Sequence, residues 1–288
     1  MKESGSGGGS AGVDHMGTDG SGGGSAGVDH MGPDGSGGGS AGLHNTNPDT
    51  TKAASDSLHN IEQLRPDIEE VCRYMGVRRG MADARILQLA EAAVDELLPR
   101  LTPREVHRDF PLSVRGEVCD FTCFSAKSRT LARHLAGCER VLLFAATIGE
   151  GADLLIRRYA KRDMARAAAV QAASAAMIET YADALCAMWQ EAFALQGYQL
   201  ITRYSPGYGD FPLDVQPLFA DVLKMEKHAG ITLTDSLLMM PSKSITAVIG
   251  MRKGSCREAA PALDRCAMCG KTDCAFSEKH DKGSDPLS

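Results

Sequence analysis

The sequence predicts an α+β fold in which a mainly antiparallel, twisted sheet packs against helices. One observation is a long Ala-rich segment, residues 164–195, whose apolar side chains recur at the three-and-four spacing of a helix. Another is a set of short apolar runs typical of strands, among them residues 140–147 (RVLLFAAT) and 244–251 (SITAVIGM). Because strands and helices alternate only in part, the pattern favours an antiparallel sheet over a parallel one.

The predicted domain begins with two helical segments. Residues 61–74 have helical character, which Pro66 interrupts and Gly76 ends. A stronger helix opens at residues 81–83, where an Asp precedes a periodic apolar run. The side chains that follow helical spacing there are Ile86, Leu89, Ala90, Ala93, Val94, Leu97 and Leu98.

The rest of the domain is predicted as short strands and helices around one long helix. Small side chains in that long helix let a neighbouring backbone approach closely, so we expect it to lie in the core. The expected order is strands at 106–114 and 118–124 joined at Gly116, a helix at 128–135, a strand at 140–147, the helix at 164–195, a strand at 199–202, a helix at 213–228 and a strand at 244–251.

A glycine-rich turn, Ile148-Gly149-Glu150-Gly151, joins the strand at 140–147 to a following helix. Such a turn at the start of a helix can bind an anion through backbone N–H groups. It can equally be a simple connection between two elements. The sequence leaves both interpretations open.

The two ends of the chain differ in composition from this domain. Residues 1–57 are rich in Gly and Ser and hold a repeat that begins at Gly5, Gly20 and Gly35. They have too few apolar side chains to offset the entropy of ordering, so we expect a disordered tail. The predicted domain covers residues 58–255, and a Cys-rich tail covers residues 256–288.

Composition argues against several classes of function. The formal net charge is −6 and no basic stripe is present, so nucleic acid is not an expected partner. No apolar run reaches the roughly 18 residues of a membrane span, and no signal peptide is evident. The 9 cysteines are odd in number and unevenly placed, which favours reduced thiols in a cytoplasm.

The most informative feature is a series of short motifs in the last third of the chain. It begins with Arg203-Tyr204-Ser205-Pro206-Gly207-Tyr208 and continues with residues 226–231 (EKHAGI), 233–236 (LTDS) and 239–242 (MMPS). In order and spacing this series resembles the S-adenosylmethionine-binding core of the activation domain of vitamin B12 (cobalamin)-dependent methionine synthase. The resemblance covers residues 61–251 and is densest from 147 to 244.

The resemblance implies that Arg203, Pro206, Gly207 and Tyr208 bind S-adenosylmethionine. The chemistry of these residues fits that ligand. Arg203 offers a planar fork of donors to the ligand carboxylate. Pro206 and Gly207 favour a sharp turn that brings the backbone against a ligand. Tyr208 offers a ring to the sulfonium or the adenine, and a hydroxyl to orient it.

The resemblance also implies outer positions of the site. Glu226 matches a family acid that would face the cobalamin module or the ligand ammonium, and Ser236 and Ser244 would donate hydrogen bonds to the ligand or the corrin edge. Local roles stay open for all three. Glu226 can form an ion pair with Lys224 or Lys227, and each serine can satisfy the backbone of its own turn.

The chain departs from the family in two respects. It has no cobalamin-binding segment of the Asp-x-His-x-x-Gly type, and residues 249–254 (IGMRKG) lack the two aromatic residues that the family places there. The resemblance therefore implies a free-standing version of the domain, with cobalamin held by a separate protein.

A second constellation lies in the C-terminal tail. Cys266, Cys269 and Cys274 are close in sequence, and Cys256 is available as a fourth ligand. Thiolates at such spacing suit zinc or an iron–sulfur cluster. A redox dithiol and plain reduced thiols are the alternatives.

We therefore expect an S-adenosylmethionine-binding activation protein in methionine biosynthesis. It would support reductive remethylation of cob(II)alamin on a cobalamin-dependent methionine synthase or related corrinoid methyltransferase, with an electron donor as a further partner. The alternatives are a metal- or iron–sulfur-binding electron-transfer module and an S-adenosylmethionine-binding protein without catalysis.

Overall fold

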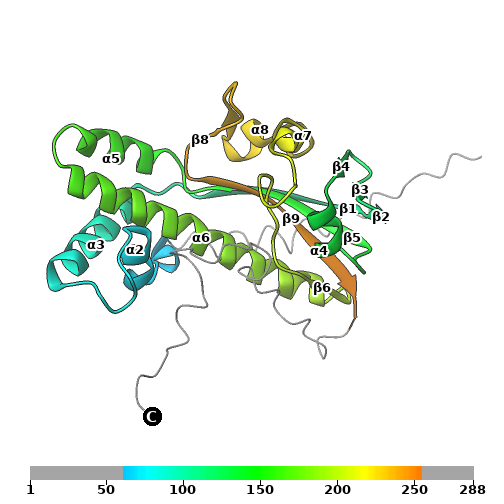
Figure 1. The fold of residues 1–288 in the computed structure, drawn as a ribbon, viewed down its shortest axis with the longest axis horizontal. Coiled ribbons are helices and arrows are strands. Elements are labelled where there is room, and N and C mark those ends of the chain that lie inside the picture. The colour runs from blue at the N-terminus through cyan, green and yellow to red at the C-terminus, as the bar shows by residue number, and fades with distance from the viewer. Residues whose placement is uncertain (1–60, 255–288) are drawn as a thin grey trace, which may run out of the picture. The chain divides into compact units, whose positions relative to one another are not determined.

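A four-stranded antiparallel sheet is the frame of the domain (Figure 1). The computed structural model describes residues 61–254. Within them the strand order is β1 (Arg104–Pro111), β5 (Arg140–Thr147), β9 (Ser244–Lys253) and β6 (Tyr198–Leu200). Every pair in this sheet is antiparallel. The predicted α+β class and the predicted strands at 140–147 and 244–251 are confirmed.

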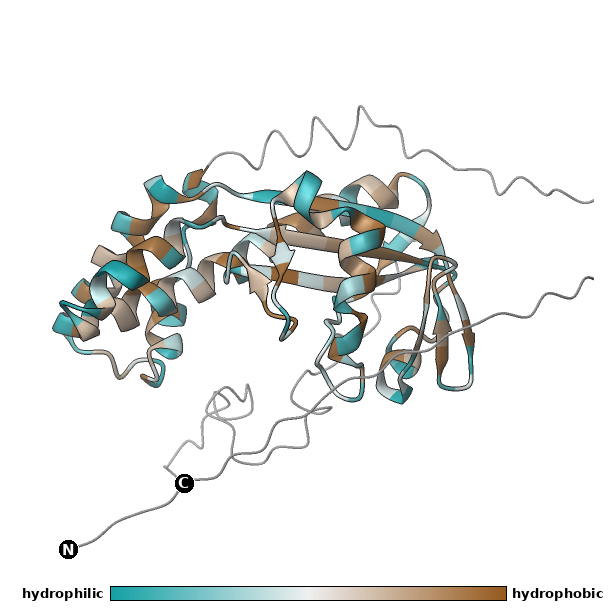
Figure 2. Cartoon of the chain, turned by 90° about the horizontal axis from the view of Figure 1, so that it is seen from above, coloured by the Kyte–Doolittle hydropathy of each residue, from teal (hydrophilic) through white to brown (hydrophobic). Residues whose placement is uncertain are grey.

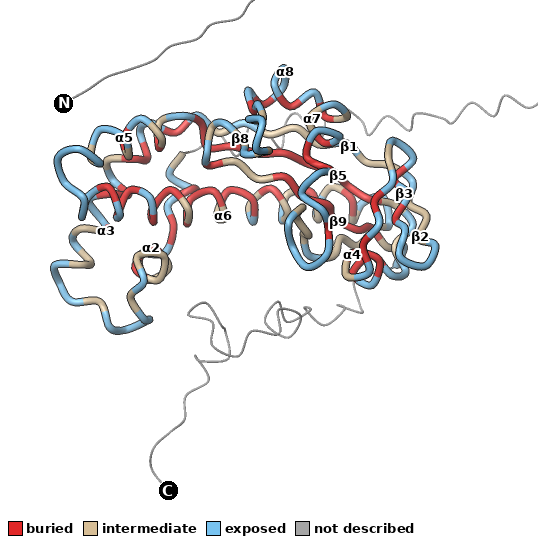
Figure 3. The backbone as a smooth tube through the Cα atoms, turned by 45° about the horizontal axis from the view of Figure 1, so that its top comes forward, coloured by how far each residue is buried: buried red, intermediate tan, exposed pale blue. Residues whose placement is uncertain are grey.

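The central strand β5 is apolar from Val141 to Ala146 because both faces of the sheet are covered there. Alternate side chains point to opposite faces of a strand. Leu142, Phe144 and Ala146 belong to one hydrophobic cluster, whereas Val141 and Leu143 belong to the other. Brown, apolar residues recur along the sheet in Figure 2, and its two central strands β5 and β9 are mostly buried in Figure 3.

One face of the sheet is covered by a helical layer with α6 (Met164–Ala194) at its centre. Asp163 caps this helix by accepting a hydrogen bond from the Arg166 N–H at 3.0 Å. Fully buried alanines of α6 allow close packing, and Trp189 contacts Phe144 with ring centroids 4.9 Å apart. The other helices of this layer are α2 (Ile68–Tyr74), α3 (Ala84–Leu97) and α5 (Gly151–Ala160), with short 3-10 turns η1 (Ile61–Leu64) and η2 (Leu98–Arg100).

The opposite face carries shorter elements around a second cluster of buried side chains, which includes Phe121, Leu131, Phe211 and Phe219. Its helices are α4 (Arg129–His134), α7 (Gln216–Leu223) and α8 (Met225–Ala229), preceded by the turn η3 (Leu213–Val215). Two small sheets complete it: β2 (Ser113–Arg115), β3 (Val118–Asp120) and β4 (Ser125–Lys127), and β7 (Thr232–Leu233) with β8 (Met239–Met240).

Two predicted elements are divided in the structure. The helix expected at 213–228 breaks at Lys224, which adopts a left-handed conformation with φ 51°. Leu223 and Met225 on either side are both fully buried, and the break lets both point into the core. The strand expected at 106–114 ends at Pro111, which has no N–H to continue a ladder, and β2 begins in another sheet.

The glycine-rich turn between β5 and α5 is shaped by close packing. A Cβ at Gly151 would lie 2.3 Å from the Arg100 carbonyl oxygen, and one at Gly149 would lie 2.0 Å from Thr102 Oγ1. The Gly149 N–H donates to Thr147 Oγ1 at 3.1 Å. These contacts favour the simple connection over an anion site. Within residues 61–254 no helix is long and apolar enough to cross a membrane.

Candidate functional site

The Arg203 motif follows β6 at the edge of the sheet. Tyr204 forms an isolated bridge to Val248 of β9, with N···O distances of 2.8 and 2.9 Å. This bridge fixes which way consecutive side chains point, because they alternate along an extended chain. Tyr204 packs into the cluster under α4 and α7, whereas Arg203 extends to α6 on the opposite face.

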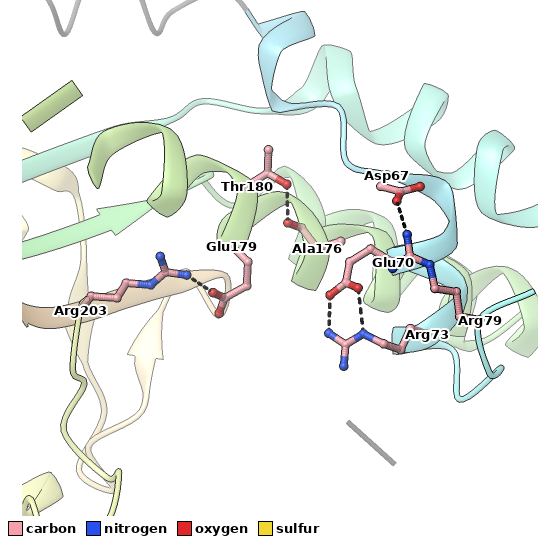
Figure 4. A network of polar contacts seen from close by, with 8 residues as sticks. All are labelled: Asp67, Glu70, Arg73, Arg79, Ala176, Glu179, Thr180 and Arg203. Carbon is pink, nitrogen blue, oxygen red and sulfur yellow. Dashed lines mark hydrogen bonds and ion pairs between the residues drawn. The ribbon is translucent and has the colours of Figure 1, made fainter. Parts of the chain in front are cut away.

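Arg203 lies between two carboxylates of α6. Its side chain is only 8% exposed, and its two terminal nitrogens form ion pairs with Glu179 and Asp183, one helical turn apart. Figure 4 shows Glu179 pointing at the Arg203 guanidinium. Burial lowers the pKa of Arg203. The hydrogen bond to Asp183 and the charges of both acids raise the pKa by more than burial lowers it, so the net shift is upward. Glu179 and Asp183 are 38% and 65% exposed, so the acids border solvent.

The next residues form a tight turn that presents an aromatic ring. Gly207 has φ 90°, which favours glycine, and its N–H donates to the Phe211 carbonyl at 2.9 Å. The Tyr208 N–H donates to the Ser205 carbonyl at 3.2 Å, while the Tyr208 residue stays 61% exposed. Arg203 and Tyr208 are thus carried on one short, hydrogen-bonded segment, with Pro206 half-buried between them.

The outer residues named from the sequence make local contacts. Glu226 is exposed on α8, and Lys224 pairs with Asp221 at 3.6 Å instead. Ser236 Oγ lies 3.0 Å from Thr234 Oγ1, and Ser244 Oγ donates to the Pro241 carbonyl at 2.7 Å. In the part of the chain that the structure describes, no hydrogen bond or ion pair of theirs reaches Arg203 or Tyr208. Their role toward a ligand stays a prediction.

The acids beside Arg203 were missed from the sequence. Their signal is visible in retrospect: Glu179 and Asp183 stand four apart in an otherwise Ala-rich helix, so they share one face. Tyr74 of α2 lies near one of these acids, Glu179. Burial raises the pKa of Tyr74, and the charge of Glu179 adds to the shift.

The predicted metal ligands Cys256, Cys266, Cys269 and Cys274 lie outside the described residues. Inside residues 61–254, no group of three or more His, Cys, Asp or Glu side chains is placed to hold a metal ion. The metal site therefore stays a prediction.

Comparison with known proteins shows which family the segment containing the Arg203 motif is similar to. Residues 131–257 match the family described as vitamin B12 dependent methionine synthase, activation domain. A solved structure described as the MetH reactivation domain bound to AdoHcy matches with a TM-score of 0.51 and 20% identity, over 70% of this chain and 78% of that chain. At that identity the likeness concerns the fold. A search of curated proteins found no match. The resemblance drawn from the short motifs is confirmed.

Proposed function

We propose that this chain, whose residues 131–257 match the activation domain of vitamin B12 dependent methionine synthase, binds S-adenosylmethionine and supplies its methyl group to a cobalamin held by another protein. The solved relative is described as binding AdoHcy, the compound that S-adenosylmethionine becomes when its methyl is transferred. The proposal for this chain rests on the geometry around Arg203.

The observation that carries the proposal is the charge arrangement of Arg203, Glu179 and Asp183. One buried cation and two partly exposed anions match a zwitterionic amino-acid group. The ligand carboxylate replaces one acid on the Arg203 fork, and the acid so released meets the ligand ammonium. The exchange leaves no charge uncompensated, which is what makes binding at a buried guanidinium favourable.

The turn supplies the second half of the site. Tyr208 presents an exposed ring beside the Arg203 segment, and a cation such as a sulfonium is attracted to the face of an aromatic ring. Gly207 lets the backbone approach the ligand without a Cβ in the way. These residues bind and orient the methyl donor.

The chemistry then has a defined balance. One electron from an external donor reduces the cob(II)alamin of the partner protein. The S-adenosylmethionine carbon–sulfur bond breaks, a cobalt–carbon bond forms, and S-adenosylhomocysteine leaves. In this scheme the chain contributes the bound methyl donor, and the corrinoid partner contributes the acceptor.

Calorimetry with S-adenosylmethionine on wild type and on Arg203→Gln tests the site. We expect the variant to lose about 2–4 kcal/mol of binding free energy, because the ligand carboxylate loses its charge-assisted pair and faces two acids. Arg140→Gln is a matched control, since it breaks an Arg–Asp pair of partly buried side chains between β5 and β1. Equal affinity in Arg203→Gln and wild type, with unchanged circular dichroism, would remove Arg203 from the site.

A further inference from the structure

The carboxylate of Asp210 links helix α4 to the turn at residues 205–209. That carboxylate accepts hydrogen bonds from Ser128 Oγ at 2.6 Å, from the Arg129 N–H at 2.9 Å and from the Thr130 N–H at 3.0 Å, and also from Thr130 Oγ1. These donors include backbone groups at the first turn of α4, where a negative charge is favoured. The side-chain donors Ser128 and Thr130, followed by the backbone donors, hold the pKa of Asp210 well below its usual range.

The packing around this contact leaves little freedom to the turn. Tyr204 Oη donates to Thr130 Oγ1 at 2.9 Å. A Cβ at Gly209 would lie 2.6 Å from both Thr130 Oγ1 and Tyr204 Oη, and Gly209 has φ 55°. Only glycine therefore fits between the turn and α4 at this position.

The C-terminal end of α4 contacts the residue that precedes Arg203. His134 Nε2 donates to the Thr202 carbonyl at 2.7 Å, and its ring lies 5.0 Å from that of Tyr204. Hydrogen bonds therefore connect α4, with its capping residue Ser128, to the chain on both sides of Arg203 and Tyr208. They are made at Thr202 and at Asp210.

We propose that Asp210 is a positioning residue of the S-adenosylmethionine site, acting through α4. This inference rests on the proposed function. The Asp210–α4 contact fixes the 205–209 turn before the ligand arrives, so that binding does not have to order it. Asp210 is itself exposed, so its loss removes little apolar burial and affects the geometry of the turn more than the stability of the core.

The test is Asp210→Asn, which keeps the shape but places an amide donor against N–H donors. We expect S-adenosylmethionine affinity to fall roughly tenfold or more, since small misplacements of binding groups have effects of this order. Asp214→Asn is the matched control, because Asp214 is an exposed aspartate nearby in η3. The Asp214→Asn protein should bind S-adenosylmethionine as tightly as wild type does. Amide hydrogen exchange at Arg129 and Thr130 should accelerate in Asp210→Asn only.

A second variant leaves the charge in place. Gly209→Ala forces a Cβ against Thr130 and should lower the affinity to a similar extent. Adding Thr130→Val to Asp210→Asn should produce little further loss, because both changes act on the same contact.

The outcomes separate the two claims. Wild type that fails to bind S-adenosylmethionine overturns the proposed function, and the role of Asp210 falls with it. Wild-type binding together with unaltered affinity in Asp210→Asn and Gly209→Ala overturns the positioning role alone. Unchanged exchange at Arg129 and Thr130 in Asp210→Asn contradicts the contact itself.

Discussion

His134 is a buried histidine that holds the segment before Arg203. Its Nε2 donates to Thr202, whereas its Nδ1 is buried and has no hydrogen-bond partner among residues 61–254. Burial lowers its pKa, and the charge of Arg252 adds to the shift, although the bond to Thr202 opposes it. Protonation of Nδ1 would therefore place an unmatched charge in the interior.

The sign of the pH dependence follows from this shift. The unfolded histidine titrates near its ordinary pKa of about 6.5 and binds a proton more readily than the folded one. The contribution of His134 to stability is thus complete above about pH 6.5 and is lost as the pH falls below it.

Urea unfolding of wild type and His134→Gln between pH 8 and pH 5 measures this contribution. The wild-type free energy of unfolding should fall faster than that of the variant, by up to about 1.4 kcal/mol per pH unit. Glutamine keeps a donor for Thr202 but does not titrate. Parallel curves for the two proteins would show that His134 does not titrate differently in the folded state.

Arg203 illustrates what could be predicted for single side chains. From the sequence alone, its place in a motif predicts a carboxylate-binding role, and that role stays a prediction. Its contacts Glu179 and Asp183 lie 24 and 20 residues away along the chain, and only the packing of α6 against the sheet brings them together. The same holds for Asp210 and Thr130, which are 80 residues apart.

At the scale of elements, long segments with a strong pattern could be predicted, and local breaks could not. The helix at 164–195 and the strand at 140–147 are confirmed almost to the residue, because periodicity and burial agree over many positions. The break at Lys224 depends on two neighbouring side chains both finding space in the core. Periodicity within one helix cannot reveal that requirement.

The glycine turn between β5 and α5 carries a prediction about packing. Gly151→Ala should destabilise the fold by about 1–3 kcal/mol, because its Cβ would enter the space of the Arg100 carbonyl. Gly254→Ala is the control, since a Cβ there meets no atom of residues 61–254 within 4 Å. The comparison uses urea unfolding at constant pH. Equal stability of Gly151→Ala and Gly254→Ala would mean that Arg100 does not constrain the turn. The interpretation of the turn as an anion site would then be open again.

At the scale of the whole molecule, the C-terminal tail holds a separate prediction. Protein purified without air should contain iron and sulfide, or zinc, bound through Cys266, Cys269 and Cys274, whose closeness in sequence lowers the entropy of convergence. Elemental analysis of wild type and Cys269→Ser tests it, with Cys123→Ser as control because Cys123 is an exposed thiol outside this group. Absence of both elements, with all three thiols open to alkylation, would defeat the prediction.

The proposed reaction belongs to the same scale, because it would join this chain to a partner. The central claim is that bound S-adenosylmethionine serves to remethylate cobalamin on a second protein. A cobalamin-binding methionine synthase module without its own activation domain is the appropriate acceptor. The reaction also needs a one-electron reductant, since cob(II)alamin must be reduced before it accepts a methyl group.

The most direct measurement follows labelled methyl from S-adenosylmethionine to the cobalamin of that acceptor, starting from cob(II)alamin. The account predicts formation of labelled methylcobalamin that requires this chain and is strongly reduced by Arg203→Gln, but not by Arg140→Gln. Labelled methylcobalamin that forms equally fast without the chain, or none at all when the chain binds S-adenosylmethionine, would contradict it.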